Sequence, residues 1–209
     1  MVREDIKEFL STIPNNVEVV AATKYVDTND MRILLNNGIN NFGENRVDSF
    51  LEKYEILKDK REIVWHFIGH LQRNKAKEVI NEIDYLHSLD SVELAKIIDK
   101  NRITPLKTFI EVSINLEKNK NGVPYYGLES FINIIKEYKN IEIVGLMMMA
   151  KKDTDNPYEE FLKLSLLKKE IEEKCHIQIP YLSMGMSDDY KEAIKAGATH
   201  VRLGRILFK

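Results

Sequence analysis

The feature that most constrains the fold of this chain is a regular alternation of apolar, β-branched runs with amphipathic helical patterns. Each apolar run has the length of a strand, and helical periodicity follows it. Such alternation is typical of parallel strands joined by crossover helices. After a helical pattern at 3–12, the predicted strands are 17–23, 39–43, 63–68, 83–89, 106–114, 141–148, 178–182 and 199–203.

The segments between these runs predict helices, and several carry their own start and stop signals. Asp27 or Thr28 can cap the first of them, Gly38 follows its end, and Pro157 suits a first helical turn. The helices are predicted at 28–37, 45–58, 72–81, 91–100, 128–139, 157–175 and 187–196. Eight βα units in 209 residues predict an α/β fold, a (β/α)8 TIM barrel forming a single domain over residues 1–209.

An open, doubly wound sheet is the alternative fold. Its first βα turn usually carries a glycine-rich dinucleotide fingerprint, and the corresponding turn here, TKYVDTND, contains no glycine. Polar residues also follow many of the predicted strands instead of clustering around one switch point. Both observations favour the barrel.

Composition restricts the partners and the compartment. The 31 Lys and Arg against 33 Asp and Glu leave a net charge of −2, so the basic excess that attracts nucleic acid is missing. Cys175 is the single cysteine, which excludes an internal disulfide and a cysteine metal cluster and fits a reducing compartment. No apolar run approaches the ~18 residues of a membrane span. We expect a cytoplasmic protein with no bound metal and no membrane or nucleic-acid partner.

In a barrel, the residues at the carboxyl ends of the strands converge on one site. Lys24 stands at the end of the buried run 17–23, although taken alone it also fits an ordinary surface lysine. The longest irregular stretch, 116–130, is expected to cover part of the site mouth. Further polar or soft side chains follow other strands, namely Asn45, His66, His87, Glu111 and Met147 to Met149.

The last two βα units indicate an anion site. A glycine-containing loop before a helix presents free backbone N–H groups, and the loop LSMGMSDD at 182–189 has this form. Ser187 or Asp188 could equally serve as an ordinary helix cap. Barrels often bind phosphate with the loops after strands seven and eight, and Gly204 would let a ligand approach the backbone.

Arg202 lies on the eighth predicted strand and is expected to point inward. There it needs an anion, a ring nitrogen or a carboxylate, and a structural salt bridge is the alternative. A lysine, a phosphate cradle and an arginine facing a ring nitrogen are the groups that pyridoxal 5′-phosphate (PLP) requires.

Five long segments resemble one known family. They are AATK (21–24), NFGENRV (41–47), WHFIGHLQRNK (65–75), LSMGMSDDYKEAI (182–194) and GATHVRLGRILF (197–208). They resemble the pyridoxal phosphate homeostasis proteins of the YggS or PROSC type. The resemblance implies a fold-type III barrel similar to that of alanine racemase, with PLP held as a Schiff base on Lys24. It also implies cofactor contacts for Asn45, Ser183, Gly185, Met186, Ser187, Arg202, Gly204 and Arg205.

Two positions depart from the family pattern. Arg46 stands where family members commonly have tyrosine, and Arg205 occupies a position usually taken by a small hydroxyl residue. If that hydroxyl normally contacts phosphate, a backbone N–H group or the arginine charge must replace it here.

The resemblance implies a carrier in intracellular PLP (vitamin B6) homeostasis, without catalytic residues, acting as a monomer and supplying apo PLP-dependent enzymes. A low-activity PLP-dependent amino-acid racemase is the alternative. A third hypothesis is a barrel that binds another phosphorylated metabolite, with Lys24 forming a Schiff base to a sugar carbonyl.

Two arguments favour the carrier over the racemase. An arginine opposite the pyridine nitrogen leaves that nitrogen uncharged, which weakens the ring as an electron sink. Racemisation by two bases needs a second acid/base group, which related racemases take from a second domain, and this chain is expected to end with its barrel. The substitutes that the sequence offers are more often packing or surface residues; they are Tyr125, Tyr126, His66 and His87.

Overall fold

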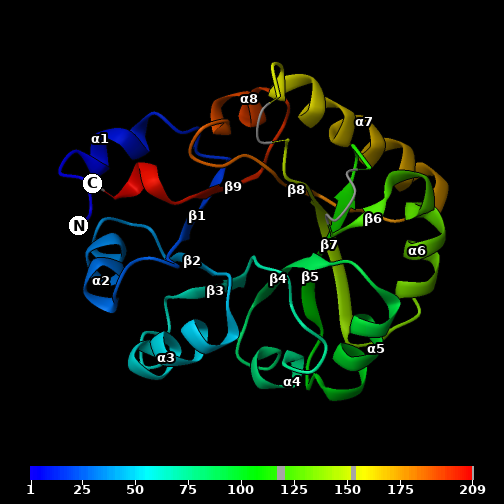
Figure 1. Cartoon of the computed structure of the whole chain (residues 1–209), viewed down its shortest axis with the longest axis horizontal. Helices are drawn as coiled ribbons and strands as arrows, with labels where there is room; N and C mark the ends of the chain where they lie inside the picture. Colours follow the sequence, from blue (N-terminus) through cyan, green and yellow to red (C-terminus); the bar gives the residue numbers. More distant parts are fainter. Residues whose placement is uncertain (117–120, 152–153, 209) are drawn as a thin grey trace.

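Eight parallel strands close into a barrel in the computed structural model, which describes residues 1–116, 121–151 and 154–208 (Figure 1). The strands are β1 (Glu18–Ala22), β2 (Asn41–Glu44), β3 (Val64–Phe67), β4 (Tyr85–Leu89), β5 (Leu106–Ser113), β7 (Ile141–Met147), β8 (Tyr181–Ser183) and β9 (His200–Leu203). They follow the order β4-β3-β2-β1-β9-β8-β7-β5, and pairing of β4 with β5 closes the ring. The predicted (β/α)8 barrel is confirmed. A short additional strand, β6 (Val123–Pro124), pairs with β5.

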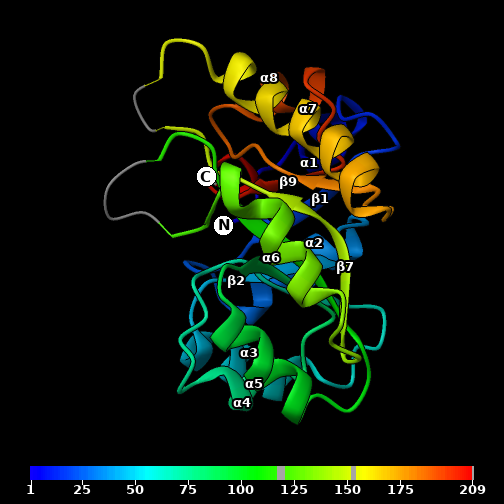
Figure 2. The same ribbon diagram turned by 90° about the vertical axis from the view of Figure 1, so that its right-hand side faces the viewer.

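Helices surround the strands, as the two orthogonal views show (Figures 1 and 2). They are α1 (Ile6–Ser11), α2 (Thr28–Asn36), α3 (Val47–Leu57), α4 (Ala76–Val79), α5 (Val92–Asn101), α6 (Leu128–Ile135), α7 (Pro157–Cys175) and α8 (Tyr190–Lys195). Two 3-10 turns, η1 (Tyr125–Gly127) and η2 (Arg205–Leu207), complete the described elements. Helix α4 is shorter than the predicted 72–81, because residues before it form turns such as the Lys75 N–H to Gln72 O bond of 3.0 Å.

Local capping chemistry places the starts of α2 and α7 where the sequence predicts them. The Asp27 carboxylate accepts from the N–H groups of Asn29 and Asp30, both at 2.9 Å, and so caps α2. Gly38 follows α2 with a φ of 89°, a left-handed conformation that favours glycine. Pro157 occupies the first turn of α7.

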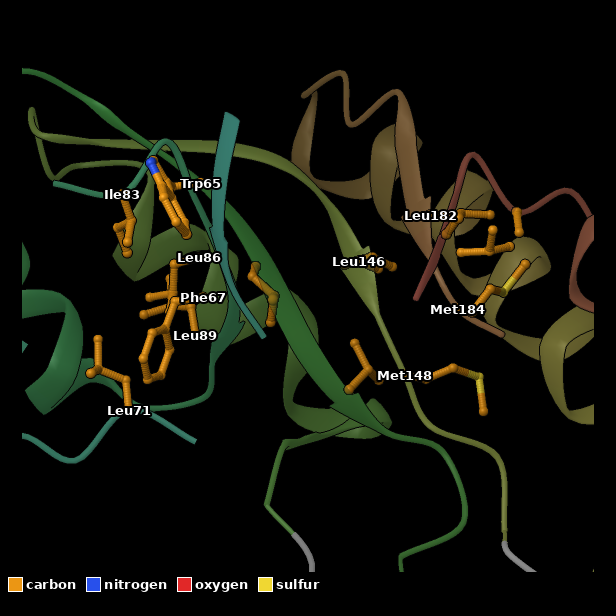
Figure 3. Packing of buried hydrophobic residues seen from close by; sticks show 14 of the residues in the cluster. Trp65, Phe67, Leu71, Ile83, Leu86, Leu89, Leu146, Met148, Leu182 and Met184 are labelled. Atoms are coloured by element: carbon orange, nitrogen blue, oxygen red, sulfur yellow. The ribbon is translucent and has the colours of Figure 1, made fainter. Parts of the chain in front are cut away.

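The barrel has two distinct packing regions. The main core lies between strands and helices, where Trp65 and Phe67 pack near Leu86 on one side and Leu146 and Leu182 pack on the other (Figure 3). A separate, smaller cluster contains Phe109, Val144 and Met147, with Tyr85 and Tyr181 against it.

Polar side chains share the barrel interior with this smaller cluster. Side chains alternate along a strand, so His66, between two outward-facing aromatic residues, faces inward. His87, Ser183, His200 and Arg202 are likewise buried on the strands. The interior is therefore aromatic and polar, unlike the aliphatic layers common in such barrels.

The two ends of the chain contact each other. Val2 forms an antiparallel bridge with Phe208, and the Arg3 guanidinium donates to Ile206 O at 3.1 Å. Both figures place the N and C marks close together. These contacts fix η2 at the mouth of the barrel. Within the described residues, none of the helices has the length and apolar character needed to span a bilayer.

Candidate functional site

A cavity of about 440 Å³ opens at the carboxyl ends of β1, β2 and β9. Of the residues predicted for the site, it brings together Lys24, Asn45, Met186, Ser187, Arg202, Gly204 and Arg205. Met149 and Asp188, which the sequence analysis placed at a strand end and in the anion-binding loop, also line it; the other lining residues were not predicted from the sequence, and they are Met1, Ala22, Tyr25, Val26, Ile68 and Phe208. The end of β9, the loop after β8 and the lysine after β1 therefore share one cavity.

Lys24 lies two residues beyond β1, and its side chain is exposed. Its ammonium nitrogen stands 4.7 Å from the centroid of the Tyr25 ring, and that ring is 85% exposed. A cation over an aromatic face is weakly attracted at such an open site. The amine is thus at the cavity wall and accessible to a ligand.

A buried ionic network holds the peptide that precedes Lys24. Lys53 of α3 donates to Thr23 O and to a carboxylate oxygen of Glu44, both at 2.6 Å. The Thr23 hydroxyl donates to the same carboxylate at 2.5 Å, and the Ser49 hydroxyl donates to its other oxygen at 3.1 Å. The network ties the ends of β1 and β2 to α3 and fixes the backbone from which Lys24 projects.

Arg202 is a buried cation, 5% exposed, in the lining of the cavity. Its Nη1 donates to Ser183 O at 2.8 Å and to Ser183 Oγ at 2.6 Å, and its Nη2 donates to Met148 O at 2.9 Å. These bonds use three of the five guanidinium donors. Burial lowers the pKa of Arg202 to about 10, while the nearby charges of Glu111 and Asp189 act in the opposite direction.

In the described part of the chain, no carboxylate lies within salt-bridge distance of Arg202. The structural salt bridge considered from the sequence is therefore not what holds this side chain. A buried guanidinium with unused donors at a cavity favours a ligand that supplies an acceptor.

Two backbone N–H groups converge on the hydroxyl of Ser187, a lining residue. Gly204 N–H and Ile206 N–H both donate to Ser187 Oγ, at 3.2 Å and 3.4 Å. Converging N–H groups are a common anion-binding arrangement. A Cβ added to Gly204 would lie 3.6 Å from the Cβ of Ala22, an ordinary contact, so protein packing does not by itself require glycine there.

The Arg205 guanidinium is not an unpaired charge at the place where these N–H groups converge. Its guanidinium is paired with the Asp188 carboxylate, and both side chains are exposed. Of the two substitutes for the missing hydroxyl that the sequence allows, the backbone N–H groups are therefore the better placed.

Two predicted residues, Ser183 and Gly185, do not line the cavity. The Ser183 side chain is fully buried and bonded to Arg202 and to His87. Gly185 has a φ of 92°, and an added Cβ would lie 2.5 Å from the Cβ of Ala193, so helix packing explains this glycine.

The predicted cradle at the start of the last helix also differs from the structure. Helix α8 begins at Tyr190, not at 187, and its N-cap is Asp189 in place of Ser187 or Asp188. The Asp189 carboxylate accepts from Met186 N–H at 2.6 Å, which occupies that donor. The Ser187 hydroxyl is instead turned toward Gly204.

Asn45 contributes an unusual polar atom to the lining. Its Oδ1 is the one buried side-chain nitrogen or oxygen atom without a hydrogen-bond partner among the described residues. A Cβ added to Gly69 would lie 2.2 Å from Asn45 O, so the backbone here is tightly packed. An orphaned amide oxygen beside a cavity fits a polar ligand, since buried polar atoms are usually bonded.

The remaining candidates from the sequence lie elsewhere. His66 and His87 are buried inside the barrel and bonded to each other. Tyr125 and Tyr126 are exposed on η1 and are absent from the lining. Residues 117–120 of the stretch expected to cover the mouth lie outside the described residues, and the described remainder of 116–130 does not line this cavity.

Residues that sequence reasoning missed follow directly after predicted strands or at the chain ends. Tyr25 and Val26 come directly after Lys24, and Ile68 comes directly after β3. Their proximity to strand ends was the available signal. Phe208 and Met1 had none, because the bridge between the two termini that brings them there is not visible in the sequence.

The residues present fit PLP. The lining supplies a primary amine at Lys24, a Gly204 N–H that donates to lining residue Ser187 together with the N–H of Ile206, and spare guanidinium donors at Arg202. These are respectively suited to an aldehyde, a phosphate and a ring nitrogen.

Known proteins share this fold and sequence. The family described as alanine racemase, N-terminal domain, matches residues 2–209. The pyridoxal phosphate homeostasis protein of Aquifex aeolicus is 39% identical over 202 residues, which cover 93% of this chain and 87% of that protein.

Solved structures agree. PipY of Synechococcus elongatus PCC7942 superposes with a TM-score of 0.94 without PLP and 0.90 with PLP bound, at 28% identity in both cases. The first match covers 100% of both chains, and the second covers 98% of this chain and 100% of that chain. Alanine racemase from Corynebacterium glutamicum shares the fold at a TM-score of 0.75 and 14% identity, over 97% of this chain and 58% of the racemase.

The fold is thus the parallel barrel found at the N-terminus of alanine racemase. The sequence matches are more specific than the fold. The chain belongs to the family of pyridoxal phosphate homeostasis proteins.

Proposed function

We propose that this protein holds PLP as a Schiff base on Lys24 and takes part in intracellular PLP homeostasis. The observation that carries the proposal is the convergence of Lys24, Arg202 and Gly204 on one cavity, where the N–H groups of Gly204 and Ile206 both donate to the lining residue Ser187. The PLP-bound form of PipY, a relative over nearly the whole chain, supports it.

Each group has a distinct part in the proposed site. Lys24 supplies the amine that binds the aldehyde, and the N–H groups of Gly204 and Ile206 take the phosphate in place of Ser187 Oγ. Arg202 directs its unused donors toward the ring nitrogen, and Asn45 offers its unpaired amide oxygen to a polar substituent. We include Met186 and Arg205 as part of the wall, and we assign Ser183 and Gly185 to the support of the site.

When bound, PLP supplies a reactive aldehyde and an electron-accepting ring. Arginine stays protonated even when burial lowers its pKa to about 10, so Arg202 donates to the ring nitrogen and does not protonate it. The ring is then a weaker electron sink, which suits storage of the aldehyde better than carbanion chemistry.

We therefore favour a carrier over the alternative, a low-activity amino-acid racemase. The relatives are named as homeostasis proteins, which supports the carrier. We further propose that the chain acts as a single-domain monomer in the cytoplasm and passes PLP to apo PLP-dependent enzymes.

A transfer assay tests this function. The purified protein, loaded with PLP and dialysed, should restore activity to an apo PLP-dependent enzyme while showing no racemisation of an amino-acid panel. Racemisation at ordinary enzyme rates of ~1 to 10³ per second would reject the carrier role. A Lys24→Ala protein should deliver no PLP, whereas Lys191→Ala, which removes an exposed lysine outside the cavity, should behave as the wild type.

A further inference from the structure

A continuous chain of hydrogen bonds crosses the barrel interior and ends at Arg202. Arg202 Nη1 donates to Ser183 Oγ at 2.6 Å, and Ser183 Oγ lies 2.8 Å from His87 Nδ1. His87 Nε2 lies 2.8 Å from His66 Nδ1, and His66 Nε2 lies 2.9 Å from Asn41 Oδ1. Asn41 lines a second cavity of about 420 Å³ that also contains Glu18 and His200. This chain of hydrogen bonds therefore joins the two ends of the barrel.

The amide of Asn41 sets the direction of these bonds. Its Nδ2 donates to Glu18 Oε2 at 3.2 Å and to Asn40 Oδ1 at 3.1 Å, so its oxygen faces His66. That oxygen can only accept, and His66 must therefore carry its proton on Nε2.

The remaining protons follow in turn along the chain. Burial lowers the pKa values of His66 and His87 well below 6.5, and both rings are neutral at pH 7. A neutral His66 with a proton on Nε2 accepts at Nδ1, so His87 donates from its own Nε2 and accepts at Nδ1. The Ser183 hydroxyl then donates to His87, and its lone pair accepts from Arg202.

Every donor between Asn41 and Arg202 has a single compatible partner. The Ser183 hydroxyl proton is committed to His87, which leaves its oxygen free to accept only from the guanidinium. Phe109 stacks on His87 with centroids 4.3 Å apart, and Tyr85 stacks on His66 at 4.6 Å, so aromatic neighbours restrict both rings. Because this series of hydrogen bonds is rigid and has one proton arrangement, it fixes the Arg202 guanidinium at its end.

We propose that His87, supported by His66 and Asn41, is a positioning residue for the PLP site: through Ser183 it holds the Arg202 guanidinium in the orientation that receives the ring nitrogen. His87 itself touches none of the cavity. The inference rests on the proposed PLP site, and it deepens that proposal by adding an interior support that extends to the far end of the barrel.

Proton positions in the ligand-free protein test the chain without reference to PLP. Long-range ¹H–¹⁵N spectra of protein labelled with ¹⁵N-histidine distinguish the two neutral tautomers of each ring. His66 and His87 should both be neutral with the proton on Nε2 at pH 7, with assignments made from His66→Gln and His87→Asn variants. An Nδ1-protonated tautomer or a charged ring at either position would overturn the proposed chain, even in a protein that binds PLP.

PLP binding tests the positioning role. His87→Leu removes the acceptor for Ser183 and should weaken PLP binding about tenfold, the effect of one lost hydrogen bond to a charged network. His87→Asn, whose amide oxygen can replace Nδ1 as acceptor, should recover most of that loss. The absorbance maximum of bound PLP should shift in His87→Leu and return in His87→Asn, because the ring-nitrogen contact changes with Arg202.

A double-variant comparison separates positioning from general damage. In an Arg202→Gln background, His87→Leu should weaken PLP binding by less than twofold, since the group it positions is gone. Thr108→Val provides a matched control, because this fully buried hydroxyl on β5 bonds to Glu142 O at 3.2 Å and is not part of the chain. It should leave PLP binding unchanged.

The two experiments fail separately. If wild-type protein does not bind PLP, the proposed function fails, and the tautomers of His66 and His87 still test the proposed chain of hydrogen bonds. If wild-type protein binds PLP and the effects of His87→Leu and Arg202→Gln simply add, the positioning role is rejected while the proposed function stands.

Discussion

The ammonium of Lys53 lies 2.6 Å from the carbonyl oxygen of Thr23, the residue immediately before Lys24. The same ammonium lies 2.6 Å from a carboxylate oxygen of Glu44, whose side chain is completely buried. Lys53 therefore helps to fix the position of Lys24. The cavity lysine projects from a peptide whose position depends on a buried ion pair that does not itself line the cavity.

Replacing Lys53 with methionine should destabilise the fold and loosen the site. The change leaves the Glu44 carboxylate buried without its cation, and breaking a buried pair in this way typically costs ~3–5 kcal/mol. Urea unfolding should show this loss, and retention of PLP on dialysis should fall. Lys58→Met, which breaks an exposed pair with Glu55, should change stability by less than ~1 kcal/mol. Equal effects of the two variants would contradict the role given to Lys53.

Arg202→Gln should weaken PLP binding without preventing the bond to Lys24. The ring-nitrogen contact is lost while the lysine amine remains in place. On dialysis, the PLP-loaded variant should lose PLP faster than the wild type. An undiminished retention of PLP would count against the role of Arg202. Arg205→Gln is the matched control, because that exposed side chain is paired with Asp188 and should contribute far less.

Ser187→Ala should destabilise the free protein and increase the stabilisation that PLP gives. In the free protein, two backbone N–H groups lose their acceptor, at a cost of about 1–3 kcal/mol. A phosphate would satisfy both groups, so the rise in melting temperature on adding PLP should exceed that of the wild type. Pyridoxal, which lacks the phosphate, should produce no such increase. An equal gain with pyridoxal would show that these groups do not bind phosphate.

Acid should destabilise the protein between about pH 6.5 and pH 4. Burial, reinforced by the Arg202 charge, lowers the pKa of His200 to about 4, and burial lowers those of His66 and His87 well below 6.5. As pH falls through this window, the unfolded chain binds protons that the folded chain does not, and stability is lost.

Glu111 opposes this trend. Burial, reinforced by the Asp90 charge, raises its pKa to about 7, so its contribution to stability is present below about pH 4.5 and is lost as pH rises through 7. Glu111→Gln should therefore steepen the loss between pH 7.5 and pH 5, measured by urea unfolding. His176→Asn changes an exposed histidine and should leave the slope unaltered. If the unfolding free energy of the wild type did not change between pH 6.5 and pH 4, this would contradict the assignment of the buried histidines as neutral.

Much of the fold follows from short-range patterns in the sequence. The eight strand positions are visible as apolar runs, and Asp27, Gly38 and Pro157 mark helix ends through local chemistry. Lys24 was found for the same reason, since a residue just after a strand must lie at the barrel rim.

The support of the site depends on contacts between distant residues. Ser183 was predicted to face a phosphate, but its hydroxyl meets His87, 96 positions earlier in the chain. Side-chain alternation on a three-residue strand gives little indication of which hydroxyl turns inward. The Lys53 bond to Thr23 likewise joins residues 30 positions apart, and no local pattern announces it.

Borohydride reduction of the PLP-loaded protein, followed by peptide mass spectrometry, tests the central claim most directly. The protein should be yellow before reduction, and the pyridoxyl mass should be fixed on the peptide containing Lys24. Lys24→Ala protein should be colourless and should carry no reduced adduct. A label on another lysine, or an unchanged visible spectrum in Lys24→Ala, would contradict the assignment of Lys24 as the residue that holds PLP.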